Sequence, residues 1–230
     1  MTRGLVLVEG QTEEQFVNDC LAPYLHTTGL ILERPTIIAT KRTVGAAHFK
    51  GGIVSYSQVR RELGLLLRDT GASVITTLID YYALPMDFPG MRDRPATSPR
   101  DRVAHVEAAW AESVGDRRFV PHLVLHEFEA WVYANPSRLE AWMFDDDVRV
   151  IEALAAVAAA HETPEDIDEG PSSAPSKRLR AVFTPYQGTL HGPPAVSAIG
   201  IDDIRAVCPH FHDWLDRLEA MARTGGADAH

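Results

Sequence analysis

The segment Gly4–Phe16, GLVLVEGQTEEQF, joins a strand to an amphipathic helix and places a carboxylate at the junction. Leu5 to Val8 form an unbroken apolar run, which is typical of a strand covered on both faces. Glu9 follows this run directly. Glu13 follows four residues later, in the first helical turn, where the helix dipole favours negative charge. The segment therefore predicts an α/β unit with an acidic residue at the C-terminal end of its first strand.

The same arrangement recurs along the first 135 residues. Hydrophobic patterning predicts strands at 4–9, 35–40, 73–80 and 119–125, and helices at 12–26, with Thr12 as N-cap, 54–68 and 101–114. This alternation predicts a mainly parallel sheet of about four strands flanked by helices. Asp80 ends the third strand, and Glu127 and Glu129 follow the fourth. Ligands of such sheets bind beyond the carboxyl ends of the strands, where these acids are expected to meet Glu9.

The second half of the chain has a different character. We expect residues 1–135 to form the α/β domain and residues 136–230 to form a helical subdomain packed on it. The segments are a helix at 137–160, a loop at 161–176, a helix at 176–183 capped by Ser176, a turn-rich stretch at 188–194 and a helix at 201–222 broken near Pro209.

Composition favours a cytoplasmic protein without a membrane association. The apolar run near the N-terminus is only four residues long, which argues against a secretory signal, and no apolar stretch approaches the ~20 residues of a membrane span. Two cysteines are too few for a disulfide framework. The net charge of −10 argues against a free-standing nucleic-acid binder, although a clustered acidic metal site contributes to that charge.

Six stretches of the chain carry a family resemblance. They are VEGQTEEQFV, KGGIVSYSQVRREL, TTLIDYYALPMDFPG, VLHEFEAWVYANP, APSKRL and IGIDDIRAVCPHFHDWL. Together they resemble the prokaryotic Domain of Unknown Function family 4276, which is Toprim-like, and they cover nearly the whole chain. The resemblance implies a Toprim-like Rossmannoid sheet with a C-terminal helical extension.

The resemblance also implies a Mg²⁺ site. The Toprim group includes topoisomerases, primases and the overcoming-lysogenization-defect nucleases, and its pattern is a glutamate after strand one and an Asp-x-Asp pair after a later strand. The nuclease branch adds a second glutamate four residues after the first. Glu9, Glu13 and Asp80 match these positions, but Tyr82 stands where the second aspartate belongs.

Other acids are candidates to replace the missing aspartate. They are Asp87, Glu127 and Glu129. Hard divalent ions prefer oxygen ligands, and Mg²⁺ (or Mn²⁺) keeps several waters while taking one or two carboxylates. Such an ion orients water and stabilises charge on the leaving oxygen in phosphodiester cleavage.

Each candidate also has a structural explanation. Glu9 is a metal ligand or general base, or else it caps the next helix, and Glu13 is an ordinary companion of a helix N-terminus. Asp80 is costly to bury without a partner, which favours a ligand role. Of Glu127 and Glu129, one is expected to bind the metal and the other to cap a helix, and the sequence leaves open which is which. His126 reads as structural rather than as a proton carrier.

Basic and aromatic residues complete the expected site. Lys50, beside Gly51 and Gly52, is placed to contact a phosphate as a catalytic residue, or else is a solvated turn lysine. Lys177 and Arg178, at a helix N-terminus, suit phosphate binding. Tyr81 and Tyr82 either stack on a base or pack at the sheet edge.

These features lead to two hypotheses from different classes. The first is a metal-dependent nuclease or phosphoesterase of a phage-defence or DNA-processing system, with DNA or RNA as substrate and an ATPase as partner. The second is a catalytically weakened module that binds nucleic acid or a partner protein, which the loss of the second aspartate favours. Hydrolysis of a small phosphorylated metabolite or nucleotide is a third, less favoured hypothesis.

Overall fold

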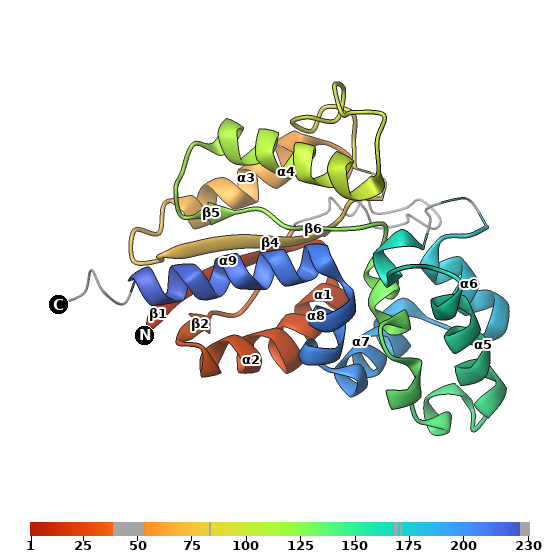
Figure 1. Ribbon diagram of the computed structural model, residues 1–230. Helices are drawn as coiled ribbons and strands as arrows, with labels where there is room; N and C mark the ends of the chain where they lie inside the picture. The colour runs from red at the N-terminus through yellow and green to blue at the C-terminus, as the bar shows by residue number, and fades with distance from the viewer. Residues whose placement is uncertain (39–52, 83, 168–169, 171, 226–230) are drawn as a thin grey trace, which may run out of the picture.

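A parallel β-sheet forms the centre of the protein (Figure 1). The computed structural model describes residues 1–38, 53–82, 84–167, 170 and 172–225. The strands are β1 (Thr2–Val8), β2 (Leu30–Leu32), β3 (Thr36–Ile37), β4 (Val74–Asp80), β5 (Phe119–Val120) and β6 (Leu123–Val124). β1 and β4 pair at the centre, with β2 and β3 along one side and β5 and β6 along the other, all in parallel. The predicted mainly parallel α/β fold is confirmed.

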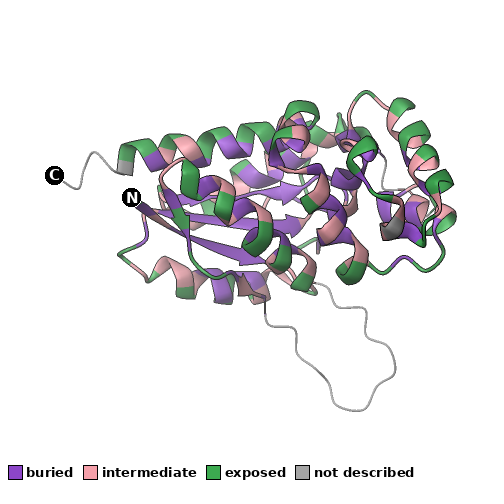
Figure 2. Ribbon diagram, turned by 90° about the horizontal axis from the view of Figure 1, so that it is seen from below, coloured by how far each residue is buried: buried purple, intermediate pink, exposed green. Residues whose placement is uncertain are grey.

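Helices cover both faces of this sheet (Figure 1), and its strands are buried (Figure 2). On one face lie α3 (Tyr56–Leu67) and α4 (Pro99–Val114), close to the ranges predicted for two helices. Val59, Val103 and Trp110 of these helices are fully buried in an apolar cluster with the strands. Burial on both faces explains the uninterrupted apolar runs of β1 and β4.

A helical run follows β1 on the other face. It comprises α1 (Gln11–Phe16), the π-helical segment η1 (Val17–Leu21) and α2 (Ala22–Thr27). Thr12 is not the N-cap: Gly10 occupies that position, and the Glu13 carboxylate accepts the Gly10 N–H at 2.8 Å. The π-helical segment precedes Pro23, which has no N–H with which to continue the regular hydrogen-bond ladder.

The C-terminal half consists of short helices. They are η2 (Phe128–Tyr133), η3 (Pro136–Arg138), η4 (Ala141–Phe144), α5 (Val148–Ala159), η5 (Pro164–Asp166), α6 (Pro175–Val182), α7 (Gly188–Ile199), α8 (Ile201–Val207) and α9 (Pro209–Gly225). The break at Pro209 is as predicted. The prediction of turns at 188–194 is wrong, because α7 buries Gly192, Pro193 and Val196 and this packing outweighs the low helix propensity of proline.

The last helix packs directly on the sheet and is not part of a separate module. α9 runs along the sheet (Figure 1), and its residues Phe211, Leu215 and Leu218 are fully buried. The indole N–H of Trp214 donates to the hydroxyl of Thr76 in β4 at 2.8 Å. One continuous apolar cluster therefore contains residues of both halves of the chain.

Two glycines in the left-handed region give a test of the packing around α4. Gly90 has φ +76°, and an added Cβ would lie 2.9 Å from the Ala109 Cβ and 3.1 Å from the Val106 Cα. Gly115 has φ +67° but meets nothing closer than 3.9 Å. We expect Gly115→Ala to lower the free energy of unfolding by about 1–2 kcal/mol. Gly90→Ala adds overpacking and is expected to lower it by roughly 2–5 kcal/mol.

Urea denaturation of the two variants measures both effects against the wild type. Equal losses in the two variants would contradict the close approach of the Gly90 turn to α4.

Candidate functional site

The parallel register brings two carboxylates together at one edge of the sheet. Val8 pairs with Leu78 on the adjacent strand. Glu9 directly follows β1 and Asp80 ends β4, so both lie at the same edge of the sheet. The Glu9 N–H donates to the Leu78 carbonyl at 3.2 Å, and the Glu9 carboxylate accepts the backbone N–H of Asp80. Sequence pattern alone predicted this juxtaposition.

The chain segment after β6 brings two more acids to this edge. His126 adopts φ +64°, a left-handed conformation uncommon for a residue with a Cβ, and its carbonyl accepts the Tyr82 N–H. This turn directs the following residues back across the sheet edge, where the Phe128 N–H donates to the Asp80 carboxylate at 3.0 Å. Glu127 and Glu129 flank Phe128 and are thereby placed beside Asp80.

Hydrogen bonds from the C-terminal helices fix these two glutamates. The Glu127 carboxylate accepts the N–H of Ser176, in the first turn of α6, at 2.9 Å. Glu129 accepts the hydroxyl of Tyr186 at 3.2 Å. A Cβ at Gly188 would lie 3.1 Å from the Glu129 carboxylate, so the glycine leaves room for it.

The resulting acidic cluster consists of Glu9, Glu13, Asp80, Glu127 and Glu129. Burial raises the pKa of Glu9, Glu13 and Glu129 to about 7. Burial also raises the pKa of Asp80 well above its ordinary value, and the negative charges of the other four carboxylates add to that rise. Carboxylates that are buried and mutually repelling either hold protons or bind a cation.

The remaining predicted residues have varied placements. Lys50 lies outside the described residues. Asp87 does not replace the missing aspartate in this structure: its carboxylate accepts the N–H of Tyr56 at the start of α3, at 3.0 Å. Tyr81 is buried in an apolar cluster and therefore packs rather than stacks on a base, whereas Tyr82 is 42% exposed.

Lys177 and Arg178 lie near the N-terminus of α6, the position that the sequence predicted for them, and both are half-buried. The Arg178 side chain donates to the Ser173 carbonyl at 2.6 Å. Burial raises the pKa of Tyr133, and the charges of Arg178, Glu129 and Glu127 act on it in opposite senses. Arg178 therefore lies close enough to Tyr133 to affect its pKa, as do Glu127 and Glu129 of the acidic cluster.

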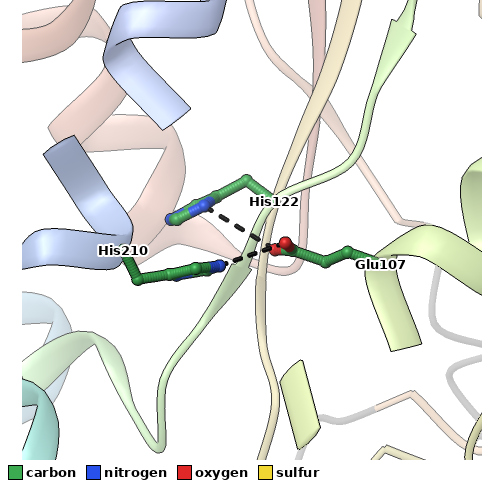
Figure 3. Close-up of side chains that lie close together, drawn as sticks. All are labelled: Glu107, His122 and His210. Atoms are coloured by element: carbon green, nitrogen blue, oxygen red, sulfur yellow. Dashed lines mark hydrogen bonds and ion pairs between the residues drawn. The ribbon is translucent and has the colours of Figure 1, made fainter. Parts of the chain in front are cut away.

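A second group of titratable residues lies away from this edge, and no sequence pattern predicted it. The rings of His122, between β5 and β6, and His210 of α9 are stacked, and both face the carboxylate of Glu107 of α4 (Figure 3). The His210 Nε2 lies 3.1 Å from the Glu107 Oε2, and the His122 Nδ1 lies 3.9 Å from the Glu107 Oε1. Three separate elements supply these residues, so no short motif reveals them.

Burial sets the charge states in this group. It lowers the pKa of His122 well below its ordinary value, and the neighbouring His210 lowers it further. Burial alone would lower the pKa of His210 as well, but the charge and hydrogen bond of Glu107 raise it. Glu107 and His210 therefore form an ion pair beside a neutral His122.

The two groups differ in spacing. Among the described residues, Glu107, His122 and His210 form the group of three whose ligand atoms lie within 4.8 Å of one another, and they could hold a metal ion. In the part of the chain that the structure describes, no three carboxylates of the acidic cluster meet this spacing. An ion that keeps water ligands tolerates a wider spacing.

Comparison with known proteins identifies one family. Residues 8–219 match the model of DUF4276, described as a domain of unknown function. Searches of the curated proteins and of the solved structures find no match. Within the described ranges, no helix combines the length and apolar character needed to cross a membrane.

The raised pKa values predict how the stability of the metal-free protein depends on pH. A glutamate whose pKa rises from 4.5 to about 7 on folding binds more protons in the folded state between these values. Its contribution to stability is therefore full below pH 4.5 and is lost as the pH rises through 7.

We expect a Glu9→Gln/Glu129→Gln variant to show a smaller loss, because Glu13 and Asp80 still titrate with raised pKa values. At pH 8 it should exceed the wild type in free energy of unfolding by roughly 1–3 kcal/mol, because one unit of pKa shift corresponds to about 1.4 kcal/mol. Urea denaturation in chelator at pH 4.5, 6 and 8 measures the difference. Parallel pH profiles for variant and wild type would show that these carboxyls titrate normally.

Proposed function

We propose that this chain, which belongs to the DUF4276 family, is a metal-dependent phosphodiester hydrolase of the Toprim-like nuclease type. The observation that carries the proposal is the acidic cluster: five acids from three segments meet at the carboxyl edge of a parallel sheet. Burial raises the pKa of four of them, and repulsion adds to the rise in Glu13, Asp80 and Glu129. Ligands bind at this edge in open α/β sheets.

The donor set fits Mg²⁺ or Mn²⁺. All the converging side chains offer carboxylate oxygens, which hard divalent cations prefer, and a cation would relieve the repulsion that burial imposes. Asp80 and Glu9 are the central ligand candidates, with Glu13, Glu127 and Glu129 around them. The bound ion would supply Lewis-acid stabilisation of the phosphoryl oxygens and an activated water.

The protein's own residues would position the reaction. Hydrogen bonds from Ser176 and Tyr186 hold Glu127 and Glu129 in place. A carboxyl group with a pKa of about 7, as in Glu9, can accept a proton from water at neutral pH and return it to a leaving oxygen. Lys177 and Arg178 on α6 supply the cationic side chains that a phosphodiester needs.

The substrate and the biological setting are also proposals. DNA or RNA is the substrate class that the Toprim-like resemblance favours, and the same resemblance motivates an ATPase partner within a phage-defence or DNA-processing system. The competing function is a non-catalytic module that binds nucleic acid or a partner protein. Exposed Tyr82 at the position of the second aspartate favours that alternative.

Removal of the central carboxylates tests the catalytic proposal. In Glu9→Gln/Asp80→Asn we expect the calorimetric signal of Mn²⁺ binding to disappear. In Glu9→Gln alone, hydrolysis of single-stranded and duplex DNA and RNA should fall by at least about 100-fold, the low end of general acid–base contributions. Glu14→Gln is the matched control, because Glu14 lies beside Glu13 on α1 and pairs with Arg34 instead.

The control should retain both metal binding and turnover. Nucleic-acid binding without hydrolysis, unchanged by Glu9→Gln, would support the binding module and contradict the enzyme.

Tyr82→Asp tests the correspondence with the Asp-x-Asp pattern. Tyr82 is 42% exposed and its backbone N–H contacts the His126 carbonyl, so the substitution leaves the turn intact. A second aspartate at this place should strengthen Mn²⁺ binding, by about tenfold for each 1.4 kcal/mol of added interaction. Unchanged affinity in calorimetry would mean that residue 82 does not face the ion.

A further inference from the structure

We propose that Glu107, His122 and His210 form a second metal site, which takes a zinc-like transition-metal ion and is independent of the acidic cluster. This inference goes beyond the proposed hydrolase function and does not rest on it. The three side chains come from opposite faces of the sheet and from the interrupted strand between them, and both imidazole rings face the Glu107 carboxylate (Figure 3).

Backbone contacts fix each of the three residues. His122 lies in the interruption between β5 and β6, where its N–H donates to the Thr77 hydroxyl and its carbonyl accepts from the same group. The Glu107 Oε1 accepts the Leu123 N–H at 2.7 Å. The backbone N–H of His210 donates to the Glu165 carboxylate at 2.9 Å. The backbone of both histidines and the carboxylate of Glu107 are therefore held in place without an ion.

One ligand atom from each residue lies within 4.8 Å of the other two. Zinc binds imidazole nitrogen and carboxylate oxygen at about 2.1 Å, which puts two tetrahedral ligands roughly 3.4 Å apart. Each imidazole faces a different oxygen of the Glu107 carboxylate: Oε2 lies 3.1 Å from the His210 Nε2, and Oε1 lies 3.9 Å from the His122 Nδ1. Two imidazoles with one carboxylate also form a donor set that suits zinc better than magnesium.

His122 supplies the observation that an ion pair alone does not explain. Glu107 and His210 satisfy each other, but within the described part of the chain neither ring nitrogen of His122 has a hydrogen-bond partner, although its side chain is only 1% exposed. Its ring is held in a stack, 4.1 Å from the Trp214 ring and 4.7 Å from the His210 ring. A buried polar group left unsatisfied costs free energy, and a bound ion would remove that cost.

A cavity of about 70 Å³ gives the site access to a further ligand. Its lining includes all three residues together with Arg100 and Arg217. The ion would keep a fourth position for water or a small anion facing this cavity. His122 lies opposite Thr77, three residues before Asp80 on β4, which places the site roughly 10 Å from the acidic cluster along the strand.

Metal titration of the full chain, stripped with chelator, tests the proposal. Zn²⁺ is titrated in excess Mg²⁺, which occupies sites selective for hard cations, and Co²⁺ is used as a spectroscopic probe because tetrahedral Co²⁺ absorbs strongly in the visible. The wild type should bind one equivalent of Zn²⁺ and give the tetrahedral Co²⁺ spectrum. His122→Gln and Glu107→Gln should bind more than about 100-fold more weakly, since even loss of an outer-shell partner costs about 10- to 100-fold.

Matched controls separate this site from other donors. His105→Gln changes a histidine of α4, the helix that carries Glu107. His212→Gln changes a half-exposed histidine of α9, two residues after His210. Asp80→Asn alters the acidic cluster. All three should bind Zn²⁺ as the wild type does. Glu107→Gln retains an oxygen that accepts the Leu123 N–H, so it tests the ligand role where His122→Gln fails to fold.

Two results would overturn the proposal. One is the absence of saturable Zn²⁺ binding in the wild type, which would leave the three residues as a structural clamp between α4 and α9. The other is wild-type affinity in folded Glu107→Gln, or loss of binding in Asp80→Asn, which would place the ion elsewhere.

Discussion

Parallel pairing of β1 with β4 is the constraint on which the rest of the structure depends. Parallel strands end at the same edge, so the register that pairs Val8 with Leu78 also fixes the distance between Glu9 and Asp80. The apolar side chains that stabilise this pairing lie on both faces of the two strands. The packing of these side chains thus holds carboxylates together that would otherwise repel one another. A bound cation would relieve this repulsion, which favours its binding.

The helices of the C-terminal half complete what the strands begin. α6 and the segment before α7 provide the N–H and hydroxyl groups that hold Glu127 and Glu129, whereas α9 covers the sheet and supplies His210. All five acids of the acidic cluster lie within residues 1–135, and two of them accept hydrogen bonds from the C-terminal half, whereas the second group takes His210 itself from that half. The two halves therefore share both the apolar core and the polar sites.

Much of the acidic cluster is predictable because it follows from local rules. A carboxylate after an apolar strand, repeated on a neighbouring strand, needs only the parallel topology to define a site, and Glu9 and Asp80 follow from that reasoning. Strand β2 is too short, at three residues, to be distinguished from a loop by its pattern. Helix α7 contains two consecutive prolines, and only its buried contacts explain why it is helical.

Glu107, His122 and His210 show where such rules stop. Each residue has an ordinary local setting, on a helix face, beside a proline or in a first helical turn, and nothing in that setting indicates the other two. Their meeting depends on how α4 and α9 pack on opposite faces of the sheet. That packing is a property of the whole core and is not encoded within any single window of the sequence.

The interruption between β5 and β6 also protects the outer edge of the sheet. Pro121 has no N–H, the N–H of His122 points inward to Thr77, and the N–H of Leu123 is taken by Glu107. Three consecutive residues of an outermost strand therefore offer no backbone donor to another chain. A row of free backbone N–H groups at a sheet edge favours strand addition and aggregation. At these three residues the edge has no such groups.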